Sequence, residues 1–304
     1  MLQHLLVLIL LSLSFLPSFA QEEGYAKAAD HKIHYYKYGQ KGTPIVIING
    51  GPGMNCEGFK SLAKTLANKG YCSIIYDQRG TGKSTIVDPN TNNIRMDLMV
   101  DDLEALRTHL QLDSWVVMGQ SFGGMLASYY ATKHPYKIKG LILSASGGID
   151  LGLFDDLNIQ GRLTDAERDS LAYWTAKINM SGDSSYYAHY RRGLALAPAY
   201  LYNKKHVPII AERLTQSNME INRLVFQDLR RIEFNCADPL SNFKPPVLII
   251  QGKQDIIGEK IAYKAANIFP NDTIVFMDKC GHYGWLDSPK IYFKSIKRFM
   301  DLVE

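Results

Sequence analysis

Short apolar segments alternate with helical segments along most of the chain, and this alternation is the strongest constraint on its fold. The apolar segments are continuous in hydrophobicity, as expected for strands that are covered on both faces. They lie at residues 44–50, 71–77, 114–121, 140–146, 246–252 and 273–278. Helical patterns follow at residues 58–68, 96–110, 124–133, 260–268 and 289–302. This order predicts an α/β protein with a doubly wound, mostly parallel sheet.

Two regions depart from this rhythm. Residues 31–39 alternate in hydrophobicity, so we expect them to form a strand at the edge of the sheet. Residues 147–242 contain no strand-like run, but they carry many aromatic side chains and helix-friendly charge patterning. We therefore expect a core made of residues 21–146 and 243–304, with residues 147–242 inserted as a helical cap.

The first twenty residues have the pattern of an export signal. An apolar run over residues 5–16 ends at Pro17, and Ser18 and Ala20 offer small side chains before a cleavage point. The run is too short, and the segment after it too acidic, for a permanent membrane span. We therefore expect removal of residues 1–20 and an exported protein, periplasmic or secreted, without a stable membrane span.

The composition is that of an ordinary globular protein. The chain has 46% hydrophobic and 21% charged residues, and its net charge of +4 is spread along the sequence, so nothing indicates nucleic-acid binding. Among the four cysteines, Cys72 lies in an apolar strand and is expected to be a buried free thiol. Because export permits disulfides, Cys56, Cys236 and Cys280 could include one bridge, and the spacing does not say which.

The segment Gly82-Lys83-Ser84 matches the last three residues of a phosphate-binding loop, but the rest of that motif is missing. The position that should hold the first glycine is Asp77, whose carboxylate would repel a phosphate, and a turn-rich segment follows in place of a helix. We therefore expect no nucleotide. No other cofactor motif and no metal-ligand spacing is present in the sequence, so we expect neither a cofactor nor a metal.

A nucleophile is predicted where a strand gives way to a helix. The segment Gly119-Gln120-Ser121-Phe122-Gly123 has small residues two places on either side of Ser121, which a strained strand-to-helix turn requires. In this topology an acid and then a histidine should follow, each just after a later strand. Asp255 and His282 occupy these positions. Asp278 is a rival acid, but it precedes His282 by only four residues.

An acyl-transfer site also needs backbone donors that stabilise an oxyanion. The glycine-rich segment after the strand at residues 44–50 lies where this fold places that loop. Pro52 has no N–H and cannot donate. We therefore predict that Gly51 supplies one donor and that Phe122, which follows the nucleophile, supplies the other.

Three motifs together resemble the proline iminopeptidase branch of the α/β-hydrolases: Gly50-Gly51-Pro52-Gly53, Asp77-Gln78-Arg79-Gly80 and Gly119-Gln120-Ser121-Phe122-Gly123-Gly124. The resemblance implies the α/β-hydrolase fold, and it implies that Asp77 and Arg79 hold neighbouring loops together. Two positions differ from the family pattern, which usually has His where this chain has Asn49 and Trp where it has Phe122.

The same resemblance implies cap glutamates that hold the α-amino group of the substrate, because a buried ammonium must be paired. Glu212, Glu220 and Glu233 are the candidates in the predicted cap. Each also fits the simpler interpretation of a solvated charge on a helix.

These features predict an exported serine hydrolase that cleaves an amide or ester bond through an acyl-enzyme. Its substrate would be a small peptide with an N-terminal proline, as the loop motifs suggest, or a small carboxylic ester. The alternative from another class is a ligand-binding, receptor-like protein on the hydrolase fold. Measured turnover would separate the two classes.

Overall fold

Eight strands form one sheet in the computed structural model, which describes residues 21–182 and 184–303. The predicted export signal, residues 1–20, lies outside the described residues. The strand order is β1-β2-β4-β3-β5-β6-β7-β8. Pairing is antiparallel from β1 to β2 and from β2 to β4, and it is parallel across the rest of the sheet. The strands are β1 (Gln21–Lys27), β2 (Lys32–Tyr38), β3 (Pro44–Ile48), β4 (Cys72–Tyr76), β5 (Trp115–Gln120), β6 (Ile138–Ser144), β7 (Val247–Gly252) and β8 (Asp272–Met277).

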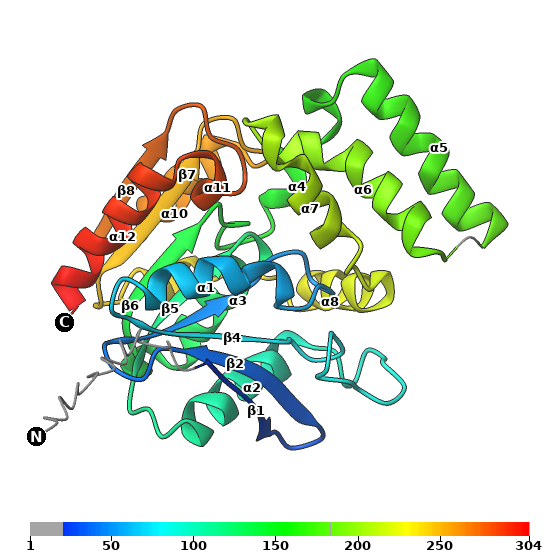
Figure 1. The fold of residues 1–304 in the computed structure, drawn as a ribbon. Coiled ribbons are helices and arrows are strands. Elements are labelled where there is room, and N and C mark those ends of the chain that lie inside the picture. Colours follow the sequence, from blue (N-terminus) through cyan, green and yellow to red (C-terminus); the bar gives the residue numbers. More distant parts are fainter. Residues whose placement is uncertain (1–20, 183, 304) are drawn as a thin grey trace, which may run out of the picture.

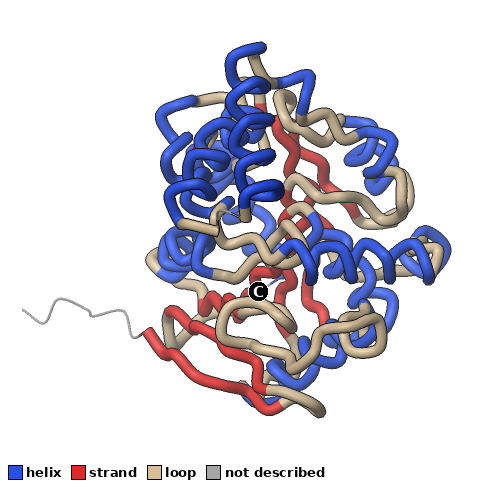
Figure 2. Tube along the Cα trace, turned by 90° about the vertical axis from the view of Figure 1, so that its right-hand side faces the viewer, coloured by secondary structure: helices blue, strands red, loops and turns tan. Residues whose placement is uncertain are grey.

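The doubly wound, mostly parallel sheet confirms the predicted fold class. All residues of β4, β5 and β7 are buried, in agreement with their continuous apolar sequences. Figure 2 shows most of the strands running through the interior with helices on both sides. Burial on both faces explains why the apolar runs were recognisable from sequence.

The prediction that residues 31–39 form the edge strand is wrong. β2 is the second strand, because β1 pairs with it along its whole length, from Gln21 opposite Tyr38 to Lys27 opposite Lys32. β1 has the sequence QEEGYAK, and most of its residues are exposed. An exposed edge strand needs no apolar run, so its sequence resembled that of a loop.

The direction of the strand crossovers decides which helices cover which face. The helices that flank the sheet are α1 (Lys60–Ala67), α2 (Met96–His109), α3 (Phe122–Lys133), α10 (Glu259–Ala266), α11 (Gly284–Asp287) and α12 (Pro289–Val303). The chain steps one way from β3 to β4 and the other way from β4 to β5. Because parallel crossovers are right-handed, α1 lies on one face and α2 and α3 lie on the other (Figure 1).

This reversal creates a topological switch point between β3 and β5. In doubly wound sheets, ligands bind outside the carboxyl ends of the strands at such a point. The loop after β3 and the turn before α3 both begin there. These are the segments in which the sequence predicted an oxyanion loop and a nucleophile.

Helices fill the chain between β6 and β7. In Figure 1 the helices α4 to α8 gather on the side toward which the arrowheads of the parallel strands point. No helix among the described residues combines the length and apolar character needed to cross a bilayer. The helices of this segment are α4 (Leu153–Asp156), α5 (Asp165–Ser181), α6 (Tyr186–Tyr200), α7 (Val207–Leu214), α8 (Met219–Arg231) and α9 (Ala237–Leu240).

The four cysteines are all buried free thiols. This confirms the prediction for Cys72. It also answers the open question about Cys56, Cys236 and Cys280, which form no disulfide with one another. Burial raises the pKa of Cys236 and that of Cys280 to about 12.

Candidate active site

Ser121 occupies a sharp turn between β5 and α3, in which its backbone is strained. Its φ and ψ are 57° and −124°, a combination that residues with a Cβ atom rarely adopt. The Ser121 N–H lies 3.2 Å from the Ser144 carbonyl and 3.1 Å from the Ala145 carbonyl, to both of which it donates. The Ser121 carbonyl accepts from the N–H groups of Gly124 and Gly147. These bonds hold the turn in place.

The glycines around Ser121 are required by close packing. A Cβ atom on Gly119 would lie 2.2 Å from the Gly123 carbonyl oxygen, and one on Gly123 would lie 2.0 Å from the Ile48 carbonyl oxygen. Real Cβ atoms do not approach backbone oxygens so closely. The motif therefore lets the nucleophile turn pack directly against the end of β3, from which the predicted oxyanion loop departs.

His282 and Asp255 form a buried hydrogen-bonded pair. The His282 Nδ1 atom lies 2.7 Å from Asp255 Oδ1, and both side chains are buried. A carboxylate can only accept, so Nδ1 carries the proton and Nε2 is left with a free lone pair, as a general base requires. The rings of Tyr200 and Tyr283 have their centroids 5.6 and 5.5 Å from that of the imidazole, which fixes its orientation.

Asp255 is held by two further donors. Gln251 Nε2 donates to its Oδ2 atom at 3.0 Å, and the Ile257 N–H donates to its Oδ1 atom at 3.2 Å. The rival acid, Asp278, is exposed and pairs with Lys253 at 2.9 Å. The structure thus brings Asp255, and not Asp278, to His282.

The predicted oxyanion donors meet at the same cavity as the nucleophile and the base. Gly51, Ser121, Phe122 and His282 all line it. Neither the Gly51 N–H nor the Phe122 N–H donates a hydrogen bond to another described residue. Phe122 is also the first residue of α3, where the helix dipole favours negative charge. Both groups are therefore available to a developing oxyanion.

The loop after β4 is structural, as the motif resemblance implied. The Arg79 guanidinium donates two 2.8 Å hydrogen bonds to the buried Asp102 carboxylate and a 2.7 Å bond to the Asn93 carbonyl. Gln78 Nε2 donates to the Asn49 carbonyl at 2.7 Å, just before the oxyanion loop. The loop thus supports the active-site loops without lining the cavity.

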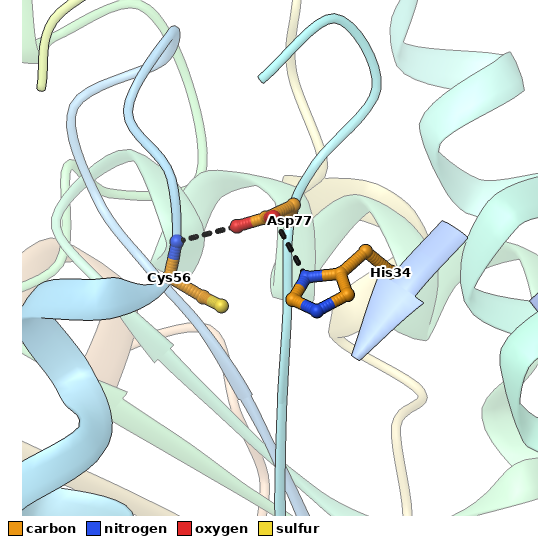
Figure 3. A group of neighbouring side chains, drawn as sticks. All are labelled: His34, Cys56 and Asp77. Atoms are coloured by element: carbon orange, nitrogen blue, oxygen red, sulfur yellow. Dashed lines mark hydrogen bonds and ion pairs between the residues drawn. The ribbon is translucent and has the colours of Figure 1, made fainter. Parts of the chain in front are cut away.

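His34, Cys56 and Asp77 form the one group of possible metal ligands among the described residues, and their ligand atoms lie within 4.8 Å of one another (Figure 3). Their bonds account for the group without a metal. Asp77 accepts from the Cys56 N–H at 2.9 Å and lies 2.8 Å from His34 Nδ1, while Glu23 lies 2.9 Å from His34 Nε2. Burial also raises the pKa of the Cys56 thiol, which disfavours the thiolate that a metal would need.

A cavity of about 250 Å³ lies between the strand ends and the helices that follow β6. Leu157, Leu196 and Phe226 contribute to its apolar wall. Arg192 and Arg213 also line it, whereas none of the described Asp or Glu side chains does. The cavity is small by the standard of ligand pockets, so it suits a small acyl group.

The structure does not bring the three candidate glutamates to this cavity. Glu212 is exposed, accepts a hydrogen bond from the Tyr186 hydroxyl and faces an outer cleft. Its neighbour Arg213 faces inward, because adjacent helical residues point in different directions. Glu220 is exposed in the first turn of α8, and Glu233 is exposed just beyond the end of that helix.

Sequence reasoning missed the cavity residues of the cap. Arg192 and Tyr200 lie on α6, and Arg213 lies on α7. An arginine or a tyrosine in a helical pattern carries no signal of its own, because its position relative to the nucleophile depends on how the helix packs on the core.

The comparisons with known proteins agree with this geometry. Residues 43–289 match the family described as alpha/beta hydrolase fold, so the chain belongs to that family. Within it, the chain is similar to proline iminopeptidases. It is 25% identical over 290 residues to the proline iminopeptidase of Lactobacillus helveticus (strain DPC 4571), which covers 92% of this chain and 97% of that protein.

Two solved structures show the same fold. VinJ superposes with a TM-score of 0.75 at 18% identity, over 93% of this chain and 99% of VinJ. The proline iminopeptidase of Mycobacterium smegmatis superposes with a TM-score of 0.65 at 22% identity, over 93% of this chain and 98% of that protein. The family match and the sequence similarity together make the chain a hydrolase that is similar to proline iminopeptidases.

Proposed function

We propose that the protein is an exported serine hydrolase that works through an acyl-enzyme. Ser121 attacks an ester or amide carbonyl while His282 Nε2 takes its proton, and the Gly51 and Phe122 N–H groups stabilise the oxyanion. His282 then protonates the leaving group, and Asp255 stabilises the imidazolium. Water hydrolyses the acyl-enzyme with His282 again acting as base.

One observation carries this proposal. A single cavity is bordered by the strained Ser121 turn, by the imidazole of the His282–Asp255 pair and by two backbone donors that have no other partner among the described residues. A binding protein needs neither a strained serine nor an oriented base. A ligand-binding role therefore has less support than turnover.

Two substrate classes differ in the charge that the cavity must accept. The relatives named proline iminopeptidases support cleavage of an N-terminal proline from a small peptide. The absence of any described Asp or Glu side chain from the cavity favours a small carboxylic ester instead, because a buried substrate ammonium would need an anionic partner. Export rests on residues 1–20 and remains part of the proposal.

The test compares a prolyl 4-nitroanilide, its N-acetylated form and a short 4-nitrophenyl ester, with Ser121→Ala as the blank. Cleavage of the free-amine prolyl substrate alone would support the aminopeptidase. Ester cleavage without prolyl activity would support the esterase. A failure of Ser121→Ala to abolish turnover would contradict the proposed nucleophile. Export is tested by N-terminal sequencing of the secreted or periplasmic protein, which should begin at Gln21.

A further inference from the structure

Arg192 is a half-buried cation that has no counter-charge among the described residues. It lies on α6 and lines the catalytic cavity. Its Nε atom donates to Thr175 Oγ1 at 3.2 Å, and no described carboxylate lies within ion-pair distance of its guanidinium. Burial lowers the pKa of Arg192. Burying a charge without a partner is costly, so this arrangement indicates a missing anion.

The second cavity arginine, Arg213, makes contacts within the protein, although its Nε atom has no partner among the described residues. Arg213 donates to the Gly50 carbonyl at 3.1 Å and to the Asn55 carbonyl at 3.4 Å, and its guanidinium lies 4.6 Å from the centre of the Phe59 ring. It therefore supports the oxyanion loop. It also adds positive charge to a cavity that no described carboxylate lines.

The position of Arg192 on α6 separates it from the reacting atoms. Arg192, Leu196 and Tyr200 follow at intervals of four residues, so they share one face of the helix, and all three line the cavity. The Tyr200 ring contacts the imidazole of His282. At about 1.5 Å per residue, the backbone positions of Arg192 and Tyr200 lie about 12 Å apart along the helix axis. An anion held by Arg192 is therefore distinct from the oxyanion that forms when Ser121 attacks the carbonyl.

We propose that the substrate carries a carboxylate, distant from the scissile bond, that the free end of the Arg192 guanidinium binds. The planar guanidinium matches the two oxygens of a carboxylate in a bidentate pair. The inference rests on the proposed hydrolase function and narrows its substrate to a bifunctional molecule. The charge is carried either by the acyl group or by the leaving group, as in a short peptide with a free carboxyl end.

Two sets of matched substrate pairs test this. For the acyl side, 4-nitrophenyl half-esters of succinate, glutarate and adipate are compared with the corresponding neutral half-amides. For the leaving-group side, prolyl-glycine is compared with prolyl-glycinamide. In at least one pair, kcat/KM should be about 10- to 100-fold higher for the charged substrate, which is the usual effect of a charge-assisted bond. Equal kcat/KM for the charged and the neutral substrate within every pair would overturn the inference without any variant.

Arg192→Gln should abolish this charge preference, so that kcat/KM for the charged substrate falls to about that of its neutral partner. Arg191→Gln is the matched control, since Arg191 carries the same charge on the same helix but stacks on Trp174 and Tyr187 and does not line the cavity. It should keep the preference. A preference that survives Arg192→Gln, or that Arg191→Gln removes equally, would contradict the assignment.

Binding is measured separately, so that this inference and the hydrolase function can fail independently. In a Ser121→Ala background, glutarate should raise the unfolding temperature more than glutaramate does, and Arg192→Gln should remove the difference. That result without hydrolysis of any substrate would support the anion site and contradict only the hydrolase function. Equal effects of glutarate and glutaramate, together with no charge preference in turnover, would overturn the anion site.

Discussion

Replacing Arg79 by methionine would separate the structural role of the loop after β4 from the chemistry. The change removes two hydrogen bonds to Asp102, one to the Asn93 carbonyl and two longer ones, at 3.4 Å, to Asp30. Asp102 is 2% exposed. Burial raises the pKa of its carboxyl group, and Arg79 offsets only part of this rise. Although His31 Nε2 stays 3.7 Å from Asp102, leaving such a carboxylate without its guanidinium partner costs about 3–5 kcal/mol. At about 2 °C per kcal/mol for a chain of this size, the melting temperature should fall by about 6–10 °C.

The sign of the pH dependence follows from Asp102. Without Arg79 its pKa should lie further above the unfolded value, so the folded variant gains stability by taking up a proton. The stability difference between wild type and Arg79→Met should be largest near neutral pH and should shrink as the pH falls through the raised pKa. Urea unfolding at several pH values measures this.

Activity completes this test. Measured below the unfolding transition, Arg79→Met should keep kcat/KM within about threefold of wild type, because Arg79 does not line the cavity. The double variant Arg79→Met/Asp102→Leu should recover most of the lost stability, since both charges are gone. A variant that unfolds like wild type but loses most of its activity would refute the structural role.

Three further predictions follow from the site and the core. Asp255→Asn should lower kcat by roughly 10³- to 10⁴-fold with little change in KM, because the amide disturbs the tautomer of His282. A fall in kcat of less than tenfold in steady-state kinetics would contradict this. Gly123→Ala should cost about 1–3 kcal/mol and reduce kcat, because its Cβ would lie 2.0 Å from the Ile48 carbonyl oxygen; unchanged urea unfolding would show that the turn relaxes. The four buried cysteines should resist a thiol reagent at about pH 8. For Cys236, a pKa raised to about 12 means that about one thiol in ten thousand is ionised at this pH. Denaturation without reductant should then release four reactive thiols, and fewer would indicate a disulfide.

The sequence predicted the parts of the molecule that depend on local pattern. The strands buried on both faces were recognisable as continuous apolar runs, and their order placed Ser121, Asp255 and His282 each just after a strand. β1 was missed, because an exposed edge strand has no need of apolar residues.

The cavity walls could not be predicted, for a different reason. Arg192 and Glu212 are both charged residues in helices that follow β6, and only their packing turns the first inward and the second outward. A helical sequence records which residues share a face. It does not record which face meets the nucleophile.

Covalent labelling of Ser121 tests the central claim most directly. The folded protein is incubated with a fluorophosphonate, and the adduct is located by mass spectrometry of its peptides. The account predicts one adduct per chain on the peptide that contains Ser121, none in Ser121→Ala, and labelling slowed by roughly 10³-fold or more in His282→Ala. Folded protein that resists the reagent, or that is labelled at the same rate without His282, would contradict an activated serine at this site.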